Sequence, residues 1–285
     1  MSNTVLFPSS FFDRTRVDED LEREHSAALS IGAFQIILFS YEDWFVNGRL
    51  RLTETPVTEI SAVYRGWMMK PEQYTEFFNQ LLAHNIRLIT TPEMYSLMHV
   101  FPNIYPSLRA HTAPILTFPL HSQINVDLVK GHFKRFLVKD YVKSVKGTEF
   151  PACFDDTITQ SEFDRWMEVF YHYRSGLLTG GICVKEFLDL KHYGEQTNEY
   201  RVFYINHEIA SICRNSLQGD YTPEPPRSLI EAYRNLDSVF YSIDYAELAD
   251  GSWTIIEAGD GSVSGLSAGQ DCASFYRALA QYLNQ

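Results

Sequence analysis

Two acidic residues stand at matching positions on either side of a strong turn signal. The dipeptide Asp250-Gly251 is typical of a two-residue hairpin turn, and it joins two predicted strands. Asp244 and Glu257 lie six or seven residues from this turn, so we expect them to be near cross-strand neighbours. Two facing carboxylates repel each other unless a cation lies between them, and magnesium prefers carboxylate and phosphate oxygens. The pair therefore predicts a magnesium site.

A third acid follows the second strand of this hairpin. Asp260 lies three residues after Glu257, within the Gly-rich segment Gly259–Gly265, and can add a metal ligand. The alternative is a solvated acidic hairpin that holds no metal. An acid that ends the apolar strand sequence WTIIE does not suit this alternative, because such a strand is expected to be buried.

A lysine ends the apolar strand predicted at Phe133–Lys139. A lysine in this position is expected at the edge of a cleft, where its ammonium group can contact phosphate as a point charge. Lys143 and Ser144 follow on the next loop, and their backbone amides and the serine hydroxyl can close over phosphate oxygens. Taken alone, Lys139 can equally be a lysine whose stem packs along apolar residues while its charge stays in water.

A second strand ends in the sequence Lys185-Glu186-Phe187-Leu188. Backbone groups of such a linker can hydrogen-bond the edge of an adenine ring, and the side chain of Phe187 or Leu188 can cover the face of the ring. The alternative is an ordinary strand that binds no ligand.

Glu199 and Arg201 are two residues apart in a predicted strand, so both side chains point to the same face of the sheet. They can form a simple ion pair, or they can supply an acceptor for ribose hydroxyls beside a clamp for phosphate. Arg214 ends the strand that is predicted to pair with this one across the turn at Asn206-His207, and it is expected near both residues.

The elements that must position these residues change character along the chain. Short apolar strands alternate with amphipathic helices up to residue 100, which indicates a parallel, doubly wound α/β lobe without a GxGxxG fingerprint. Its predicted strands are Thr4–Pro8, Gln35–Phe39, Ser61–Tyr64 and Arg87–Ile89, and its predicted helices are Asp18–Ile31, Pro71–Asn85 and Pro92–His99. Four prolines then mark residues 101–122 as irregular. We place the domain boundary here, at 1–105 and 106–285.

The second domain is predicted to be α+β with antiparallel sheets, because two of its strand pairs are hairpins. The hairpins are predicted at Glu199–Arg214 and Val239–Glu257, and the helices at Ser161–Tyr173, Pro226–Leu236 and Gln270–Leu283.

The bulk composition argues against several classes of protein. The 285-residue chain has a net charge of −12, whereas nucleic-acid binding requires many cations to replace counterions. Its one basic cluster, between Lys130 and Lys146, suits a small anionic ligand better. The four cysteines contain no CxxC pair, which argues against structural zinc. No signal peptide or membrane-length apolar run is present, so we expect a cytoplasmic protein without a membrane partner.

Taken together and in this order, the segments from residue 110 to 285 resemble an ATP-grasp enzyme. The resemblance implies ATP and Mg²⁺ as cofactors. It implies that Lys139 binds phosphate and that Asp244 and Glu257 hold the metal. It also implies that the Glu186–Leu188 linker contacts adenine and that Glu199 contacts ribose. The first lobe is similar to the pre-ATP-grasp domain that usually precedes this fold, and the whole chain is most similar to a little-characterised clade of short bacterial and phage proteins.

The sequence departs from the usual ATP-grasp pattern at three places. The metal motif of the family has an asparagine two residues after the glutamate, where this chain has Gly259, so the last ligand is placed on Asp260. A second phosphate-binding lysine has no clear match, and Arg109 is the candidate replacement. The Gly-rich flap after the lysine strand is short and is limited to Lys143–Gly147.

The resemblance implies an ATP-dependent carboxylate–amine ligase that works through an acyl phosphate. Lys139 would neutralise charge on the transferred phosphoryl group, with Arg201 or Arg214 assisting. The expected partners are small-molecule or peptide carboxylates and amines that bind between the lobes. Arg65 can bind such a carboxylate or form a structural ion pair. The alternative functions are an ATP-grasp kinase, acting on a small molecule or a protein, and a non-catalytic nucleotide-binding module. The sequence identifies neither the substrates nor the oligomeric state.

Overall fold

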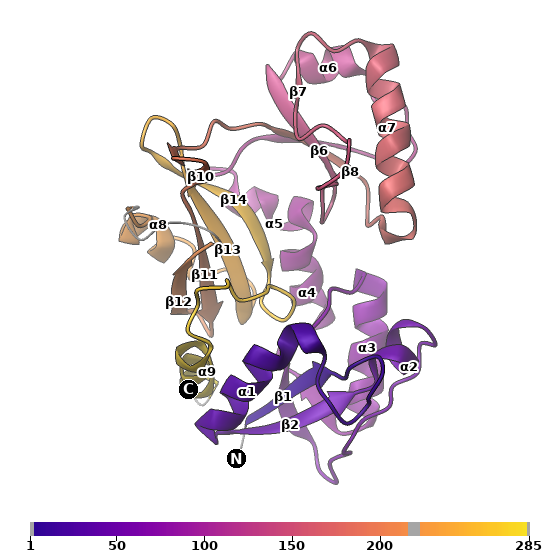
Figure 1. Cartoon of the computed structure of the whole chain (residues 1–285), viewed down its shortest axis with the longest axis vertical. Coiled ribbons are helices and arrows are strands. Elements are labelled where there is room, and N and C mark those ends of the chain that lie inside the picture. Colours follow the sequence, from indigo (N-terminus) through magenta and orange to yellow (C-terminus); the bar gives the residue numbers. More distant parts are fainter. Residues whose placement is uncertain (1–2, 216–222, 284–285) are drawn as a thin grey trace.

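The computed structural model describes residues 3–215 and 223–283 and divides into three regions that surround a central gap between ribbons (Figure 1). The lower region contains a four-stranded parallel sheet in the order β2-β1-β3-β4, as the sequence predicts. Its strands are β1 (Asn3–Pro8), β2 (Phe34–Phe39), β3 (Ile60–Tyr64) and β4 (Ile86–Leu88). The carboxyl ends of β1 and β3 are adjacent, and ligands of such sheets bind beyond these ends.

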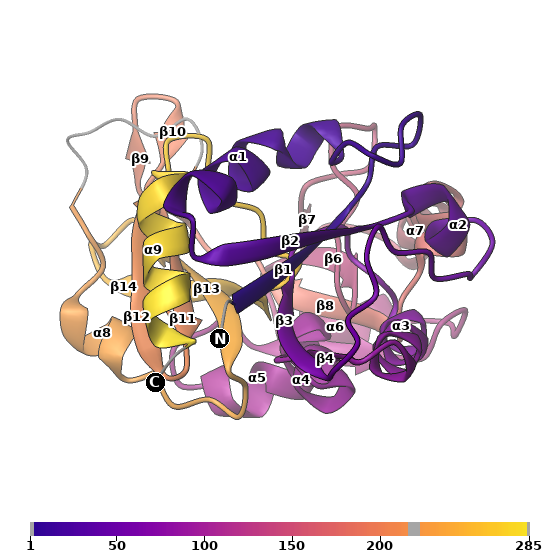
Figure 2. The same cartoon turned by 90° about the horizontal axis from the view of Figure 1, so that it is seen from below.

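Helices cover both faces of this sheet. Its helices are α1 (Glu22–Ile31), the unpredicted α2 (Tyr41–Phe45), α3 (Pro71–Ala83) and α4 (Pro92–His99). The alternation along β1 divides the core, because Leu6 packs with α3 residues whereas Val5 and Phe7 pack with residues of α9 (Cys272–Tyr282). The last helix of the chain therefore lies beside the first one (Figure 2).

Residues 101–122 are not irregular, and this prediction from the prolines is wrong. They contain α5 (Phe101–Leu108) and β5 (Ile115–Phe118). Pro102 lies in the first turn of α5, where a backbone N–H has no helical partner to lose. Pro106 does fall inside the helix, but the buried side chains of Phe101 and Leu108 pack against the sheet of the second domain. This burial outweighs the weak local propensity.

The upper region is built on a four-stranded sheet in the order β5-β8-β6-β7. Its further elements are α6 (Val126–Lys130), β6 (Arg135–Asp140), β7 (Phe154–Asp155), α7 (Gln160–Arg174) and β8 (Ile182–Glu186). Thr159 caps α7 in a capping box with Glu162, which satisfies two backbone amides at the start of the helix. One apolar face of α7, with Phe163 and Phe170, packs on Phe136 and Val184 of the sheet.

The central sheet is antiparallel and has the order β12-β11-β13-β14, which confirms both predicted hairpins. Its strands are β11 (Glu199–Ile205), β12 (Glu208–Arg214), β13 (Phe240–Glu247) and β14 (Trp253–Asp260); β9 (His192–Tyr193), β10 (Gln196–Thr197) and α8 (Arg227–Glu231) lie beside it. Asn206 and His207 both have positive φ, 46° and 65°, as a tight hairpin turn requires. The domain boundary near residue 105 remains a prediction.

Candidate active site

A cleft of about 730 Å³ lies between the upper sheet and the central sheet. Strands β6 and β8 form one wall, and β11, β13 and β14 form the other. Most of the side chains singled out in the sequence line this single cleft: Lys139, Lys143, Lys185, Glu186, Phe187, Leu188, Glu199, Arg201, Asp244 and Glu257. The structure therefore brings together residues that are up to 118 positions apart.

Three of the cleft residues form a row across the central sheet. Asp244 of β13 pairs in register with Arg201 of β11 on one side and with Glu257 of β14 on the other. Cross-strand partners share a face of the sheet, so all three side chains point into the cleft. The predicted juxtaposition of Asp244 and Glu257 is confirmed. A β-bulge between Asp244 and Tyr245 sets this register.

Each of the two acids is paired with a basic side chain. Lys139 Nζ donates to both carboxylate oxygens of Glu257, at 3.0 and 2.9 Å. Arg201 grips Asp244 with two parallel hydrogen bonds, from Nε at 2.8 Å and from Nη2 at 2.7 Å. Burial favours the neutral acid of Glu257, but the charges of Lys139 and Lys185 outweigh it and lower its pKa. The cation expected between the two acids is thus supplied by the protein itself.

The donor set nevertheless fits Mg²⁺ in the presence of a phosphate ligand. Mg²⁺ is commonly held by one or two carboxylates together with phosphate oxygens. Asp244 and Glu257 offer these carboxylates, and Lys139 and Arg201 can transfer their hydrogen bonds to phosphate. Within residues 3–215 and 223–283, no group of three or more His, Cys, Asp or Glu side chains is arranged to hold a metal without such a ligand.

A second lysine reaches the same place from the neighbouring strand. Lys185 of β8 lies opposite Leu137 of β6, on the same face as Lys139. Its Nζ donates to the backbone carbonyl of Ile256 at 2.7 Å, and Phe101 of α5 lies beneath both ammonium groups, at 4.2 Å from Lys185 and 5.2 Å from Lys139. Burial and Lys139 lower the pKa of Lys185 to about 8, against the opposing charge of Glu257.

Lys185, and not Arg109, occupies the place expected for a second phosphate-binding cation. Arg109 is exposed at the end of α5 and does not line the cleft, so its proposed role is withdrawn. The sequence contained a usable signal, because Lys185 ends an apolar strand in the same way as Lys139. Adjacent strands that end alike can bring such lysines together, but only the strand order β8-β6 shows that these two strands are adjacent.

The linker after β8 forms the opposite end of the cleft. Arg135 lies over the ring of Phe187, with its guanidinium carbon 4.5 Å from the ring centroid, and forms an ion pair with Asp189. Glu199 accepts a hydrogen bond from the Thr197 hydroxyl at 2.6 Å and lines the same part of the cleft. An apolar linker beside an acid suits a nucleoside, as the sequence predicts, and this role remains a prediction.

Two predicted site residues face away from the cleft. Arg214 pairs with Tyr200, whereas Cys213 is the residue opposite Arg201, so Arg214 projects from the other face of the sheet. Asp260 is an odd number of residues from Glu257 on β14 and is fully buried behind the cleft wall. We therefore assign neither catalysis to Arg214 nor metal binding to Asp260.

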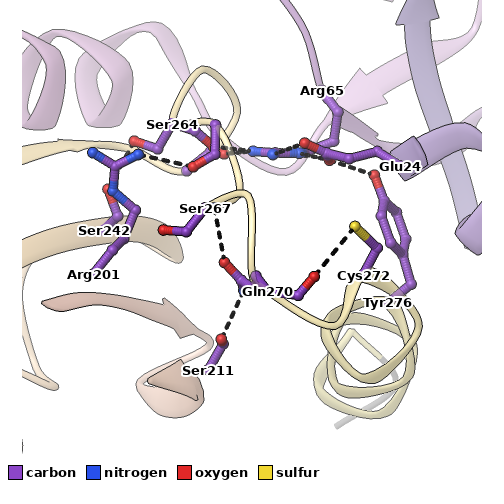
Figure 3. Close-up of polar contacts among 12 residues, drawn as sticks. Glu24, Arg65, Arg201, Ser211, Ser242, Ser264, Ser267, Gln270, Cys272 and Tyr276 are labelled. Carbon is purple, nitrogen blue, oxygen red and sulfur yellow. Dashed lines mark hydrogen bonds and ion pairs between the residues drawn. The ribbon is translucent and has the colours of Figure 1, made fainter. Parts of the chain in front are cut away.

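Arg65 is a buried structural residue and is not available to an acceptor. Figure 3 shows its guanidinium between Glu24 and the segment Gly261–Gly265. Its Nε and Nη2 donate to Glu24 at 2.8 and 2.7 Å, and Nη1 donates to the carbonyls of Gly261 and Ser264. Burial opposes its charge, but Glu24 more than compensates and raises the pKa of Arg65 further. This ion pair ties the first lobe to the loop that follows β14.

The same loop contacts the row of charged residues. Its Gly265 carbonyl accepts a hydrogen bond from Arg201 Nη1 at 2.8 Å (Figure 3). The Ser242 and Ser264 hydroxyls are hydrogen-bonded to each other at 2.7 Å, opposite the position of Gly259. A Cβ atom at Gly259 would lie 2.9 Å from Ser264 Oγ. The two hydroxyls therefore fill the space where the usual motif places an asparagine.

A small chamber of about 90 Å³ adjoins the cleft. It shares the four residues Lys143, Arg201, Asp244 and Glu257 with the cleft, and its remaining walls are Met68, His99, Val142, Ser242, Ala258, Gly259, Val263, Ser264 and Gly265. His99 ends α4, and its pKa is lowered to about 4 by burial and by Lys143. Neither Met68 nor His99 was predicted as a site residue, because both lie in apolar segments of the first lobe.

The fold and this cleft define an ATP-grasp protein. Residues 129–279, more than half of the chain, match a family described as an ATP-grasp domain, the third family of its clade. The chain belongs to this family. A search of curated protein sequences gives no match.

Solved structures of ATP-grasp proteins resemble the whole chain. D-cycloserine synthetase DcsG aligns with a TM-score of 0.62 at 15% identity, over 98% of this chain and 99% of its own. The ATP-grasp ligase PsnB, complexed with a minimal precursor, Mg and ADP, aligns with 0.61 at 10% identity, over 100% and 99%. D-alanyl-alanine synthetase A from Vibrio cholerae aligns with 0.59 at 12% identity, over all of both chains. These similarities confirm the predicted fold, with an α/β first lobe and antiparallel ATP-grasp lobes.

Proposed function

We propose that the protein is an ATP-dependent carboxylate–amine ligase that forms an acyl phosphate. One observation carries this proposal: the facing acids Asp244 and Glu257, each paired with a cation, line a cleft that also contains Lys185 and an apolar linker. A triphosphate nucleotide complements both ends of such a cleft. The ligases DcsG, PsnB and D-alanyl-alanine synthetase A share the fold, which supports the same class of chemistry for this chain.

The reaction begins with attack of a carboxylate oxygen on the γ-phosphorus of ATP, which releases ADP and leaves an acyl phosphate. An amine then attacks the acyl carbon, loses a proton and expels inorganic phosphate. Mg²⁺, when held by Asp244 and Glu257, would neutralise charge on the phosphates. Lys139 and Arg201 would release these acids and donate to phosphate oxygens as negative charge shifts toward ADP.

The first experiment tests nucleotide binding without knowledge of the acceptor. Calorimetry with a non-hydrolysable ATP analogue and Mg²⁺ should give saturable binding in the wild type. Glu257→Gln and Asp244→Asn should abolish turnover because they weaken the Mg²⁺ site, whereas Asp250→Asn at the tip of the same hairpin should not. Absence of analogue binding by the wild type would refute the proposed site.

The second experiment identifies the reaction. The protein is incubated with ATP, Mg²⁺ and pooled amino acids and peptides, and ADP, phosphate and product masses are followed. Release of ADP that depends on an amine, with a condensed product, is the result expected of a ligase. A stable phosphorylated product formed without an amine would identify a kinase, and binding without any turnover would identify a nucleotide-binding module.

A further inference from the structure

We propose that the small chamber beside the cleft is the subsite for the carboxylate that receives the phosphoryl group, and that His99 contacts this carboxylate. The inference rests on the proposed function, because it requires ATP to lie in the cleft. It adds the position and the size of the acceptor group, and it identifies a residue of the first lobe that binds it.

The chamber continues the cleft at the phosphate end. The two cavities share Lys143, Arg201, Asp244 and Glu257, which are the charged residues assigned to phosphate and metal. The linker residues assigned to adenine do not line the chamber, so it lies beyond the phosphates and not beside the base. A group held there faces the end of the triphosphate chain, where in-line attack on the γ-phosphorus begins.

The volume of the chamber limits what can enter. Its roughly 90 Å³ equal about three times the 30 Å³ that one water molecule occupies in the liquid. A carboxylate and one or two methylene groups fill such a space, and a branched carbon next to the carboxylate does not fit. The rest of a larger acceptor must therefore remain outside the chamber.

The walls of the chamber suit an anion. Lys143 and Arg201 contribute positive charge, and the two acids that also face the chamber are those assigned to Mg²⁺. The His99 ring is buried and stacks on Tyr95 with centroids 4.7 Å apart, which fixes its orientation. An imidazole held in this way can donate a hydrogen bond to a carboxylate oxygen without adding another cation beside Lys143.

The entrance is formed by the loop that follows β3. Met68 lines the chamber and is nevertheless 41% exposed, so it lies where the chamber opens to solvent. Its neighbour Trp67 is 38% exposed. Large exposed apolar side chains beside a polar chamber provide a surface for the aliphatic part of an acceptor, and methionine adapts its shape to different ligands. The acceptor is thus a carboxylate at the end of a short unbranched arm.

The test uses acetate as the probe and the protein saturated with Mg²⁺ and a non-hydrolysable ATP analogue. Binding is followed by NMR of ¹³C-labelled acetate, and also by the His99 ring signals, which are assigned by their loss in His99→Gln. We expect saturable acetate binding that shifts the His99 signals, and we expect no binding of pivalate, which is branched next to its carboxylate. His99→Leu should weaken acetate binding about 10-fold or more, while His99→Gln, which keeps a donor, should restore most of it.

A substitution at the entrance provides a second, independent variant. Met68→Trp should block acetate and leave the affinity for the ATP analogue within about 3-fold of wild type, because Met68 does not line the cleft. Val46→Trp, at another exposed apolar position of the first lobe, is the matched control and should change neither.

The outcomes separate this inference from the proposed function. If the wild type does not bind the ATP analogue, the proposed function fails before acetate is added. If the analogue binds, the inference is overturned by any of three results: acetate does not bind, pivalate binds as well as acetate, or His99→Leu binds acetate like the wild type. Competition between acetate and the analogue would also overturn it, because the chamber would then belong to the nucleotide site.

Discussion

Replacing Asp260 with asparagine is expected to change how the stability of this protein depends on pH. The Asp260 carboxyl is fully buried, and its Oδ1 accepts a hydrogen bond from the Ser262 backbone amide at 2.9 Å. Its Oδ2 has no hydrogen-bond partner among the described residues. Burial raises the pKa of Asp260 from 3.8 to about 7, against the opposing effects of Ser262 and Arg65. The folded protein therefore keeps a proton that the unfolded chain loses at lower pH.

The sign and size of the effect follow from this difference. Because the folded-state pKa is raised, the stabilisation by protonated Asp260 is complete below the unfolded pKa and is lost as pH rises through about 7. One pKa unit corresponds to about 1.4 kcal/mol, so the free energy of unfolding should lose about 3 kcal/mol between pH 5 and pH 8. At about 2 °C per kcal/mol, the Tm of Asp260→Asn should gain about 6 °C relative to wild type over this range.

The assay is thermal unfolding of both proteins at about pH 5, 6.5 and 8, with the exposed Asp237→Asn as the control. The control should follow the wild type at every pH. Parallel Tm curves for wild type and Asp260→Asn would refute the reasoning, because Asp260 would then be ionised in the folded state. If Asp260→Asn also lost Mg²⁺-dependent binding of the ATP analogue, Asp260 would be the metal ligand that the sequence predicts.

Three further substitutions test other contacts. Lys139→Met should weaken ATP-analogue binding roughly 10- to 100-fold in calorimetry, whereas the exposed Lys134→Met should not; equal affinities would remove Lys139 from the phosphate site. Glu24→Gln leaves the buried Arg65 charge unpaired and should cost about 3 kcal/mol in denaturant unfolding, and a cost below about 1 kcal/mol would contradict this account. Thr159→Ala removes a helix cap and should lower Tm by about 2 °C, so an unchanged Tm would show that the cap does not contribute.

Local signals in the sequence predicted the elements of the site well. The Asp250-Gly251 turn, the alternation of β14 and the apolar end of β6 depend on neighbouring residues, so they could be read without tertiary information. The first lobe was predicted for the same reason, since each of its strands is a short apolar run next to an amphipathic helix. The prolines of α5 misled the prediction because burial of the opposite face of the helix overrides local propensity.

The bulges explain why one pairing was right and another was wrong. The turn at Asn206-His207 pairs Ile205 with Glu208, and an unbroken register would place Arg214 opposite Glu199, as expected. A bulge between Phe203 and Tyr204 shifts the register by one residue. A shift of one residue moves a side chain to the other face of the sheet. Arg214 therefore lies opposite Tyr200.

The hairpin of the two acids contains a bulge with the opposite consequence. Near the turn, Glu247 pairs with Trp253, a register that would place Asp244 opposite Ile256. The bulge beside Tyr245 shifts the pairing by one residue and brings Glu257 opposite Asp244. The expected pair is present, but its register depends on an irregularity that the turn signal does not contain.

The sequence by itself determined which residue types are available for the chemistry, the strands that carry them, and the turns that join neighbouring strands. Tertiary structure decided which of them meet. It placed Lys185 beside Lys139, buried Arg65 against Glu24, turned Asp260 away from the cleft, and brought His99 from the first lobe to the chamber. The physical reason is that strand order, bulges and lobe packing depend on burial summed over segments far apart in the chain, whereas helix and turn signals depend on a few neighbouring residues.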